Sequence, residues 1–232
     1  MNIPDEVLRA AGPAAAWSDD HEGLSGDVWR AGSSYVKRSG AEERDRLLWL
    51  GKHFEVPEIQ AFAEDWLVLA DVGAPSLVSA DPVVAATVMG TVLRSLHSLP
   101  VASCPYDATI PVVLERARHN VEAGLVDQGD FDDDNLGVTP EELLERLVAT
   151  APATEDLVVA HGDFCPANVL LHPDGSTVLI DVARLGVSDR HRDIALAHRE
   201  LGEEAAAAFD RAYGLTPRPE MLAWYRLLDE FF

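Results

Sequence analysis

The sequence predicts an α+β fold in two parts: a small lobe with an antiparallel sheet and one helix, and a larger, mainly helical lobe. Short apolar and β-branched runs separated by turns fill residues 28–72, and helical patterns with cap signals dominate after Pro75. A chain of 232 residues, 47% of them apolar, has room for one large domain or two small lobes. We therefore expect an N-terminal lobe at residues 1–72 and a C-terminal lobe at residues 73–232.

The first lobe is expected to contain a hairpin, a helix and a strand. The order along the chain is a pair of strands joined at Gly32 (residues 27–38), a helix at residues 41–53 that stops at Gly51, and an apolar strand at residues 65–72. The leucines of the helix provide its apolar side.

Cap signals order the second lobe. Asp81 before Pro82 predicts an N-cap with proline at the first helical position, and Thr139 with Glu142 forms a capping box. The remaining elements are expected as helices at residues 110–126, 192–213 and 219–232, and strands at residues 157–160, 169–171 and 176–180. Asp174-Gly175 is a turn signal, so the last two strands form a hairpin.

Polar side chains stand at the ends of these strands. Asp163 follows the run "LVVA" and His161-Gly162, Asn168 comes five residues later, and Asp181 ends the returning strand. The hairpin brings Asn168 and Asp181 together, and a carboxylate with an amide oxygen suits Mg²⁺, which takes its other ligands from water and phosphates. Asp163 is left to accept a proton from a hydroxyl or to orient it. This combination is typical of phosphoryl transfer.

A kinase-type site also needs a lysine held by a glutamate. Lys37 ends the second strand and Glu43 begins the next helix, the arrangement that lets a lysine reach nucleotide phosphates. The preceding segment "EGLSGDV", with Ser25 at its centre, is a candidate nucleotide-covering turn that is poor in glycine. Taken singly, each feature has an ordinary explanation: a turn, a helix cap, a surface ion pair. Their joint occurrence in this order favours the kinase.

The net charge of the chain limits the classes of molecule that it is expected to bind. Forty acidic residues against 18 basic give a net charge of −22, which argues against nucleic acid, because binding phosphates requires lysine and arginine. No apolar run is long enough for a membrane span, and the acidic N-terminus lacks the basic and apolar regions of a signal peptide. Two cysteines make no disulfide framework or zinc pattern, so we expect a cytoplasmic protein. An acidic surface fits either plain solubility or a cationic substrate.

In these residues the chain resembles the aminoglycoside O-phosphotransferases, specifically their 3′ class. The family pattern H-G-D-x4-N is matched at His161 to Asn168, and the following I-D-x-G-R-x-G-x-x-D-R-x-x-D at Ile180 to Asp193. The stretches "LHSLPVASCPYD", "EAGLVDQGDFDDD" and "YRLLDEFF" resemble the 3′ class more narrowly. The match runs from about residue 23 to the C-terminus and implies a protein-kinase-like two-lobe fold.

The resemblance implies roles for the residues that match. Asp163 is the catalytic base, Asn168 and Asp181 bind Mg²⁺, and Lys37 with Glu43 binds the phosphates of ATP or GTP. The backbone from Ala70 to Val72 is the implied hinge for the adenine. Substrate contacts are implied for Asp130, Asp132, Asp133, Arg184, Glu200, Glu203, Glu230 and the terminal carboxylate of Phe232. Residues 122–134 hold six acids and no Lys or Arg, which suits a cationic aminoglycoside, and the protein is expected to be a monomer or weak dimer.

One departure from the pattern affects the metal site. Ala183 stands where the family has glycine, two residues after Asp181. If that position requires φ > 0, alanine adds ~1 kcal/mol of strain and displaces the loop. Two other functions therefore stay open: a kinase of the same fold with another small-molecule acceptor, such as a different antibiotic or an amino alcohol, and a non-catalytic pseudokinase that only binds its ligand.

Overall fold

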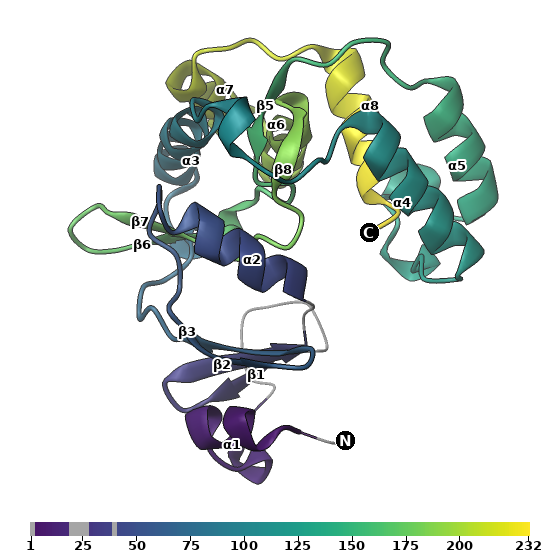
Figure 1. Ribbon diagram of the computed structural model, residues 1–232. Helices are drawn as coiled ribbons and strands as arrows, with labels where there is room; N and C mark the ends of the chain where they lie inside the picture. The colour runs from purple at the N-terminus through teal and green to yellow at the C-terminus, as the bar shows by residue number, and fades with distance from the viewer. Residues whose placement is uncertain (1–2, 19–27, 39–40) are drawn as a thin grey trace. The chain divides into compact units, whose positions relative to one another are not determined.

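The structure, a computed structural model, describes residues 3–18, 28–38 and 41–232 and divides into two compact units (Figure 1). The first unit is Met1–Ala80 with Pro166–Arg184, and the second is Asp81–Cys165 with Leu185–Phe232. The expected boundary at residue 72 differs from this division in one important respect. The hairpin after Pro166 belongs with the N-terminal part, because its backbone pairs there.

A four-stranded antiparallel sheet forms the first unit, in the order β1-β2-β4-β3. Its strands are β1 (Val28–Ala31), β2 (Ser34–Arg38), β3 (Ile59–Ala63) and β4 (Trp66–Ala70), accompanied by the helices α1 (Asp5–Ala11) and α2 (Ala41–Leu50). Gly32 has a φ of 64°, which suits the tight β1–β2 turn and confirms the expected hairpin. β3 and α1 were not expected from the sequence.

The core of this sheet is built on aromatic rings. Trp66 is 2% exposed, and its ring centroid lies 6.0 Å from that of Trp17 and 5.6 Å from that of Trp29. Val7 of α1 and Val36 of β2 are fully buried in the same cluster. Because α1 supplies buried residues to the cluster, it completes a core that three or four short strands would leave open.

The hairpin of β6 (Val169–Leu171) and β7 (Thr177–Leu179) turns at Asp174-Gly175 as expected. Gly175 has a φ of 89°, and Asp174 accepts a hydrogen bond from the Ser176 N–H. Two backbone hydrogen bonds tie the hairpin to the first unit: Leu171 N–H to the Pro75 carbonyl at 3.0 Å and Leu179 N–H to the Glu55 carbonyl at 3.1 Å. These bonds fix the position of the segment that carries Asn168 and Asp181.

Helices make up most of the second unit. They are α3 (Pro82–His97), α4 (Ile110–Glu122), α5 (Pro140–Ala149), α6 (His191–Glu200), α7 (Glu203–Tyr213) and α8 (Pro219–Asp229), together with the strand pair β5 (Leu157–Ala160) and β8 (Gly186–Asp189). Both predicted caps are confirmed: the Asp81 carboxylate accepts from the N–H groups of Val83 and Val84, and Thr139 with Glu142 completes its capping box. Among the described residues no helix is long and apolar enough to cross a membrane.

One long helix expected at residues 192–213 is wrong. The chain instead forms α6 and α7, separated at Leu201 and Gly202, both of which have extended backbone angles. α7 then lies against α3 (Figure 1), and Gly90 of α3 permits a close approach. A Cβ at Gly90 would lie only 2.5 Å from the Phe209 carbonyl oxygen and 3.0 Å from the Tyr213 nitrogen. This contact fixes Tyr213 beside α3.

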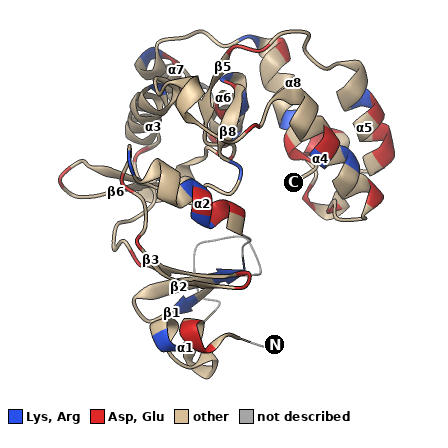
Figure 2. Ribbon diagram, viewed as in Figure 1, with Lys and Arg blue, Asp and Glu red and all other residues tan. Residues whose placement is uncertain are grey.

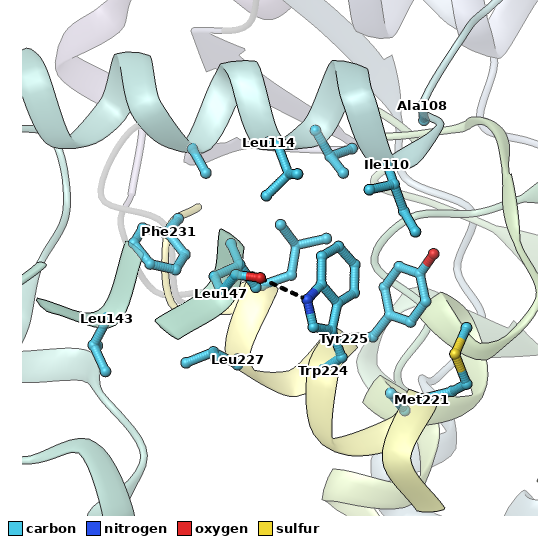
Figure 3. Close-up of a cluster of buried hydrophobic side chains, with 14 of the residues drawn as sticks. Ala108, Ile110, Leu114, Leu143, Leu147, Met221, Trp224, Tyr225, Leu227 and Phe231 are labelled. Atoms are coloured by element: carbon cyan, nitrogen blue, oxygen red, sulfur yellow. Dashed lines mark hydrogen bonds between the residues drawn. The ribbon is translucent and has the colours of Figure 1, made fainter. Parts of the chain in front are cut away.

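A separate core joins α4, α5 and α8 (Figure 3). Trp224 of α8 is 3% exposed and donates its indole N–H to the Leu147 carbonyl of α5 at 2.9 Å. Phe231, just after α8, is 1% exposed, and its carbonyl accepts a 2.7 Å hydrogen bond from Asn120 of α4. The end of the chain is therefore anchored, which holds Glu230 and Phe232 in place.

Candidate active site

Lys37 lies at the centre of an ion cluster in the first unit. Its Nζ is 2.7 Å from Glu43 Oε2 and 3.1 Å from Asp181 Oδ1. β2 supplies the lysine and the first turn of α2 supplies Glu43, whose side chain is 1% exposed. The pairing expected from the sequence is present, and Asp181 joins it.

The electrostatics of this cluster favour a charged lysine. Burial alone lowers the pKa of Lys37, but the negative charges of Asp181 and Glu43 outweigh it and raise the pKa above its ordinary value. Lys37 is therefore a fixed positive charge at neutral pH. A buried lysine held between two carboxylates is suited to bind phosphate oxygens with little rearrangement.

Asn168 lies next to Asp181 in the same unit. Asn168 ends a short 3₁₀ helix, Pro166–Asn168, and its carbonyl accepts a hydrogen bond from Ile180 N–H at 3.1 Å. The β6–β7 register, with Val169 opposite Leu179, therefore brings the predicted metal ligands to one end of the hairpin. A single carboxylate and an amide oxygen are hard donors, so this set fits a Mg²⁺ ion that takes its remaining ligands from phosphates and water.

The strain expected at Ala183 is absent. Among the described non-glycine residues, positive φ occurs at Glu64 and at Asp181, whose φ is 56°, and not at Ala183. Aspartate is one of the few residues that tolerates this left-handed conformation. The unusual backbone geometry of the loop therefore lies at Asp181, the predicted metal ligand, and alanine at position 183 needs no left-handed backbone.

Asp163 follows β5 in the second unit, on a turn whose Gly162 has a φ of 88°. Asp193 of α6 holds this turn: its carboxylate accepts hydrogen bonds from the N–H groups of His161 and Gly162, each at 2.7 Å. His97 Nε2 of α3 lies 2.9 Å from the same carboxylate. The backbone before Asp163 is thus clamped from the helical side.

Asp193 is fully buried, and the hydrogen bonds decide its charge. Burial alone raises the pKa of Asp193, but the hydrogen bond from His97, the electrostatic attraction of His97 and His161 and the Gly162 backbone hydrogen bond together hold the pKa below its ordinary value. The sequence prediction assigned no role to His97 or to this clamp. A polar side chain directly after Leu96 on the apolar face of a helix was the available signal, because buried histidine requires partners.

The expected adenine hinge follows β4. Ala70 N–H already donates to the Glu58 carbonyl at 2.9 Å, and Asp71 N–H donates to the Ser33 carbonyl at 2.8 Å. Val72 N–H makes no hydrogen bond recorded among the described residues. Of the two hinge residues predicted, Val72 is therefore the one with a backbone donor available for a ligand.

The predicted acidic substrate region lies around the end of α8 and the loop between α4 and α5 (Figure 2). Asp132 N–H donates to both Glu230 carboxylate oxygens at 3.2 Å, and the Asn135 amide also donates to Glu230. Arg146 of α5 donates to Asn135 in turn. Glu230, predicted as a substrate contact, therefore also fastens the acidic loop to the end of the chain.

The acidic side chains around the end of α8 differ in their surroundings. Asp130 and Asp133 are exposed, while Asp229 pairs with Arg199 Nη1 at 2.8 Å. Burial, followed by the nearby charges of Asp132 and Asp229, raises the pKa of Glu230 above its ordinary value, against the hydrogen bonds from Asn135 and Asp132. The exposed acids Asp130 and Asp133, with Asp132 beside the Glu230 carboxylate, give this region a local excess of negative charge. An ammonium group would relieve that excess.

The other predicted contacts belong to both units. Arg184 is half-buried at the end of the hairpin segment in the first unit, and Glu200 is exposed at the end of α6 in the second. Phe232 is 38% exposed beside α4, where it borders a hollow of about 830 Å³ lined also by Glu115 and His119. Ser25 and the side chain of Glu203 lie outside the described residues, so their predicted roles stay predictions.

Comparison with known proteins decides the family. The family model described as "Phosphotransferase enzyme family" matches residues 28–228. This chain belongs to that family. An aminoglycoside 3′-phosphotransferase of Streptomyces fradiae is 43% identical over 212 residues, covering 82% of this chain and 78% of the relative. The resemblance found from the sequence motifs is confirmed.

Solved structures of the family agree. The crystal structure of an aminoglycoside-3′-phosphotransferase of type VIII superposes with a TM-score of 0.83 at 37% identity, covering 93% of each chain. An aminoglycoside phosphotransferase, APH(3″)-Id of Streptomyces rimosus, in complex with ADP and streptomycin gives 0.79 at 29% identity, covering 97% of this chain and 96% of that one. The predicted kinase-like α+β fold is confirmed, and the phosphotransferase is an enzyme of the kinase type.

Proposed function

We propose that this phosphotransferase transfers the γ-phosphoryl group of ATP to the 3′-hydroxyl of aminoglycoside antibiotics and thereby inactivates them. The observation that carries the proposal is the Lys37 cluster, in which Nζ lies 2.7 Å from Glu43 and 3.1 Å from Asp181. The cluster occurs in a chain that is 43% identical to a relative named for this activity. A phosphate-binding lysine with both partners in place argues against a non-catalytic role.

Each residue of the proposed site has one task. Lys37 binds phosphate oxygens of the nucleotide, and Val72 N–H is the hinge donor toward the base. Asn168 and Asp181 hold Mg²⁺, which neutralises phosphate charge when bound. Asp163 orients the attacking hydroxyl and accepts its proton. The turn at Gly162, which Asp193 holds by a hydrogen bond, positions the backbone of Asp163.

The acidic region of the second unit supports a cationic acceptor. An aminoglycoside carries several ammonium groups, and Asp130, Asp132, Asp133 and Glu230 supply negative charge around the end of α8, where Phe232 is proposed as a further contact. Glu200, Glu203 and Arg184 are proposed as outer contacts. The net charge of −22 attracts such a cation at range and opposes binding of nucleic acid. We further propose that the protein acts in the cytoplasm, as a monomer or weak dimer.

A second candidate is phosphorylation of a 3″-hydroxyl. It is favoured by the TM-score of 0.79 with the phosphotransferase whose structure contains ADP and streptomycin. The two candidates share the nucleotide site and differ only in how the acidic region positions the acceptor. An acceptor panel therefore separates them.

The test is ADP release with ATP and Mg²⁺ against kanamycin, neomycin, 3′-deoxy tobramycin, streptomycin and no acceptor. We expect turnover with kanamycin and neomycin and none with tobramycin, because tobramycin lacks the hydroxyl that is phosphorylated. Turnover with streptomycin alone supports the 3″ candidate. Nucleotide binding without turnover on any acceptor contradicts both. GTP in place of ATP in the same assay defines the nucleotide.

A further inference from the structure

A hydrogen-bonded series of buried and partly buried polar side chains in the second unit ends at the turn before Asp163. Arg190 Nη1 donates to the Tyr213 hydroxyl oxygen at 3.0 Å, and that oxygen lies 2.8 Å from His97 Nδ1. His97 Nε2 lies 2.9 Å from Asp193, which accepts from the backbone of the catalytic turn. We propose that Tyr213 and Arg190 are positioning residues for the catalytic turn and act through His97 and Asp193. The kinetic part of this inference rests on the proposed role of Asp163.

The donors and acceptors available determine the direction of each hydrogen bond between Arg190 and Asp193. Arg190 is a donor only, so its bond occupies a lone pair of the Tyr213 oxygen and leaves the tyrosine proton for His97 Nδ1. His97 Nδ1 then accepts, and Nε2 carries the proton that it donates to Asp193. His97 is neutral in this arrangement, and each donor in the chain has an acceptor.

The neighbours of the Tyr213 hydroxyl support the same hydrogen-bond direction. The Arg190 guanidinium is held by Asp156, whose Oδ2 lies 2.6 Å from Arg190 Nε, and it contacts the hydroxyl that faces Nδ1. If Nδ1 were protonated, the Tyr213 hydroxyl would receive two donors, and its own proton would have no acceptor recorded among the described residues. Tyr213 therefore selects the tautomer in which His97 faces Asp193 with an N–H group.

The consequence for the catalytic turn follows from Asp193. Its carboxylate accepts from His161 N–H and Gly162 N–H at 2.7 Å each, and the His97 N–H is the side-chain donor that orients it. If Nδ1 carried the proton instead, Nε2 would present a lone pair to the carboxylate and repel it. A shift of the turn would move Asp163, and displacement by about 1 Å can cost ~10²-fold in rate.

Tyr213 is carried by α7, so the inference links that helix to catalysis. Gly90 allows α7 to approach α3 closely enough for Tyr213 to reach His97, as the 3.0 Å distance from a hypothetical Gly90 Cβ to the Tyr213 nitrogen indicates. A second histidine–aspartate pair, between α6 and α7, has no recorded hydrogen bond to the described turn before Asp163 and serves as a comparison. His198 Nε2 lies 2.8 Å from Asp210 Oδ1, with no bond recorded to the described catalytic turn.

Tyr213→Phe in the full-length protein removes only the hydroxyl, and Asp210→Ala is the matched control. We expect the phenylalanine variant to lower kcat about tenfold with KM for both substrates within about twofold of wild type. We expect the control to keep kcat within about twofold. Equal losses of kcat in the two variants would overturn the inference, because general destabilisation would then explain both.

NMR decides the same question without relying on activity. Imidazole ¹⁵N shifts of the wild-type protein should show His97 protonated at Nε2 and unprotonated at Nδ1. Tyr213→Phe should change these shifts and those of the His161 and Gly162 amides, while Asp210→Ala should leave all of them in place. A wild-type His97 protonated at Nδ1 overturns the inference. The NMR result holds even if the acceptor panel refutes the proposed substrate, so the two failures are distinguishable.

Discussion

In the first unit two carboxylates converge on one lysine, whereas around the end of α8 in the second unit Asp130 and Asp133 are exposed and the Asp132 backbone lies against the Glu230 carboxylate. Lys37 has both partners within 3.1 Å, and its position is defined before any ligand binds. Around Glu230 several acids lie close together. Burial and the charges of Asp132 and Asp229 raise the pKa of Glu230. The first cluster is suited to bind an anion by close contact, and the second attracts a cation through its field.

The largest effect is expected at Asp163, which belongs to neither cluster. Asp163→Ala should lower kcat by roughly 10²–10⁴-fold, because a positioned general base is removed. KM for ATP and for kanamycin should stay within about twofold, since both charged clusters remain intact. Steady-state kinetics and the thermal midpoint of the variant check this. Near-normal kcat would remove Asp163 from the chemistry and leave the comparison of the two clusters unaffected.

The next effect separates binding from stability in the Lys37 cluster. Lys37→Ala should raise KM for ATP by about 10- to 100-fold, the equivalent of a charge-assisted hydrogen bond of ~1.5–3 kcal/mol. It should also lower the unfolding free energy, because Glu43 is left as a buried, uncompensated charge.

The double variant Lys37→Met with Glu43→Gln is the matched control for that effect. Removing both charges should restore most of the stability and none of the nucleotide affinity. Urea unfolding and ATP titration measure the two quantities separately. If the double variant regained ATP affinity as well, the cluster would be structural and the proposed phosphate contact would be wrong.

The acidic cluster should respond to charge and to salt. Asp132→Asn should raise KM for kanamycin about tenfold, near 1.4 kcal/mol, while Glu141→Gln, an exposed acid in the first turn of α5, should change it little. Raising ionic strength from about 0.05 to 0.5 M should increase KM for kanamycin, because the field is screened. It should leave KM for ATP unchanged or lower it, since a chain of −22 repels the nucleotide. Parallel salt dependence of both substrates would contradict the difference between the clusters.

Local features were predictable from the sequence, and contacts between distant segments were not. The Gly32 turn, the Asp81 cap and the Thr139 capping box are each determined by neighbouring residues, and all are confirmed. The break at Gly202 was missed because the helical pattern continues across it, although Leu201 and Gly202 have extended backbone angles. β8 was missed because its partner β5 lies about 30 residues away.

The same limit applies to the site. Lys37 and Glu43 are six residues apart, so their pairing was expected, and Asn168 with Asp181 followed from one hairpin. The Asp193 clamp joins α6, α3 and the turn before Asp163 across about 30 to 100 residues; the local pattern shows that His97 needs a partner but not which residue it is. Positive φ was expected near Ala183 from the family glycine, but it occurs two residues earlier.

The smallest expected effect concerns Ala183. Ala183→Gly should leave kcat within about twofold and lower the unfolding free energy by roughly 0.5–1 kcal/mol, because Ala183 lacks positive φ and glycine only adds freedom to the unfolded chain. Gly175→Ala, in the turn of the preceding β6–β7 hairpin, is the contrasting variant: its φ is 89° with no atom within 4 Å of an added Cβ, so strain alone should cost about 1–2 kcal/mol. Thermal unfolding and kinetics of both variants measure this. A large gain in kcat for Ala183→Gly would mean that the loop must reach a left-handed conformation at residue 183 during turnover, and that the Lys37–Asp181 contact is only one of its states.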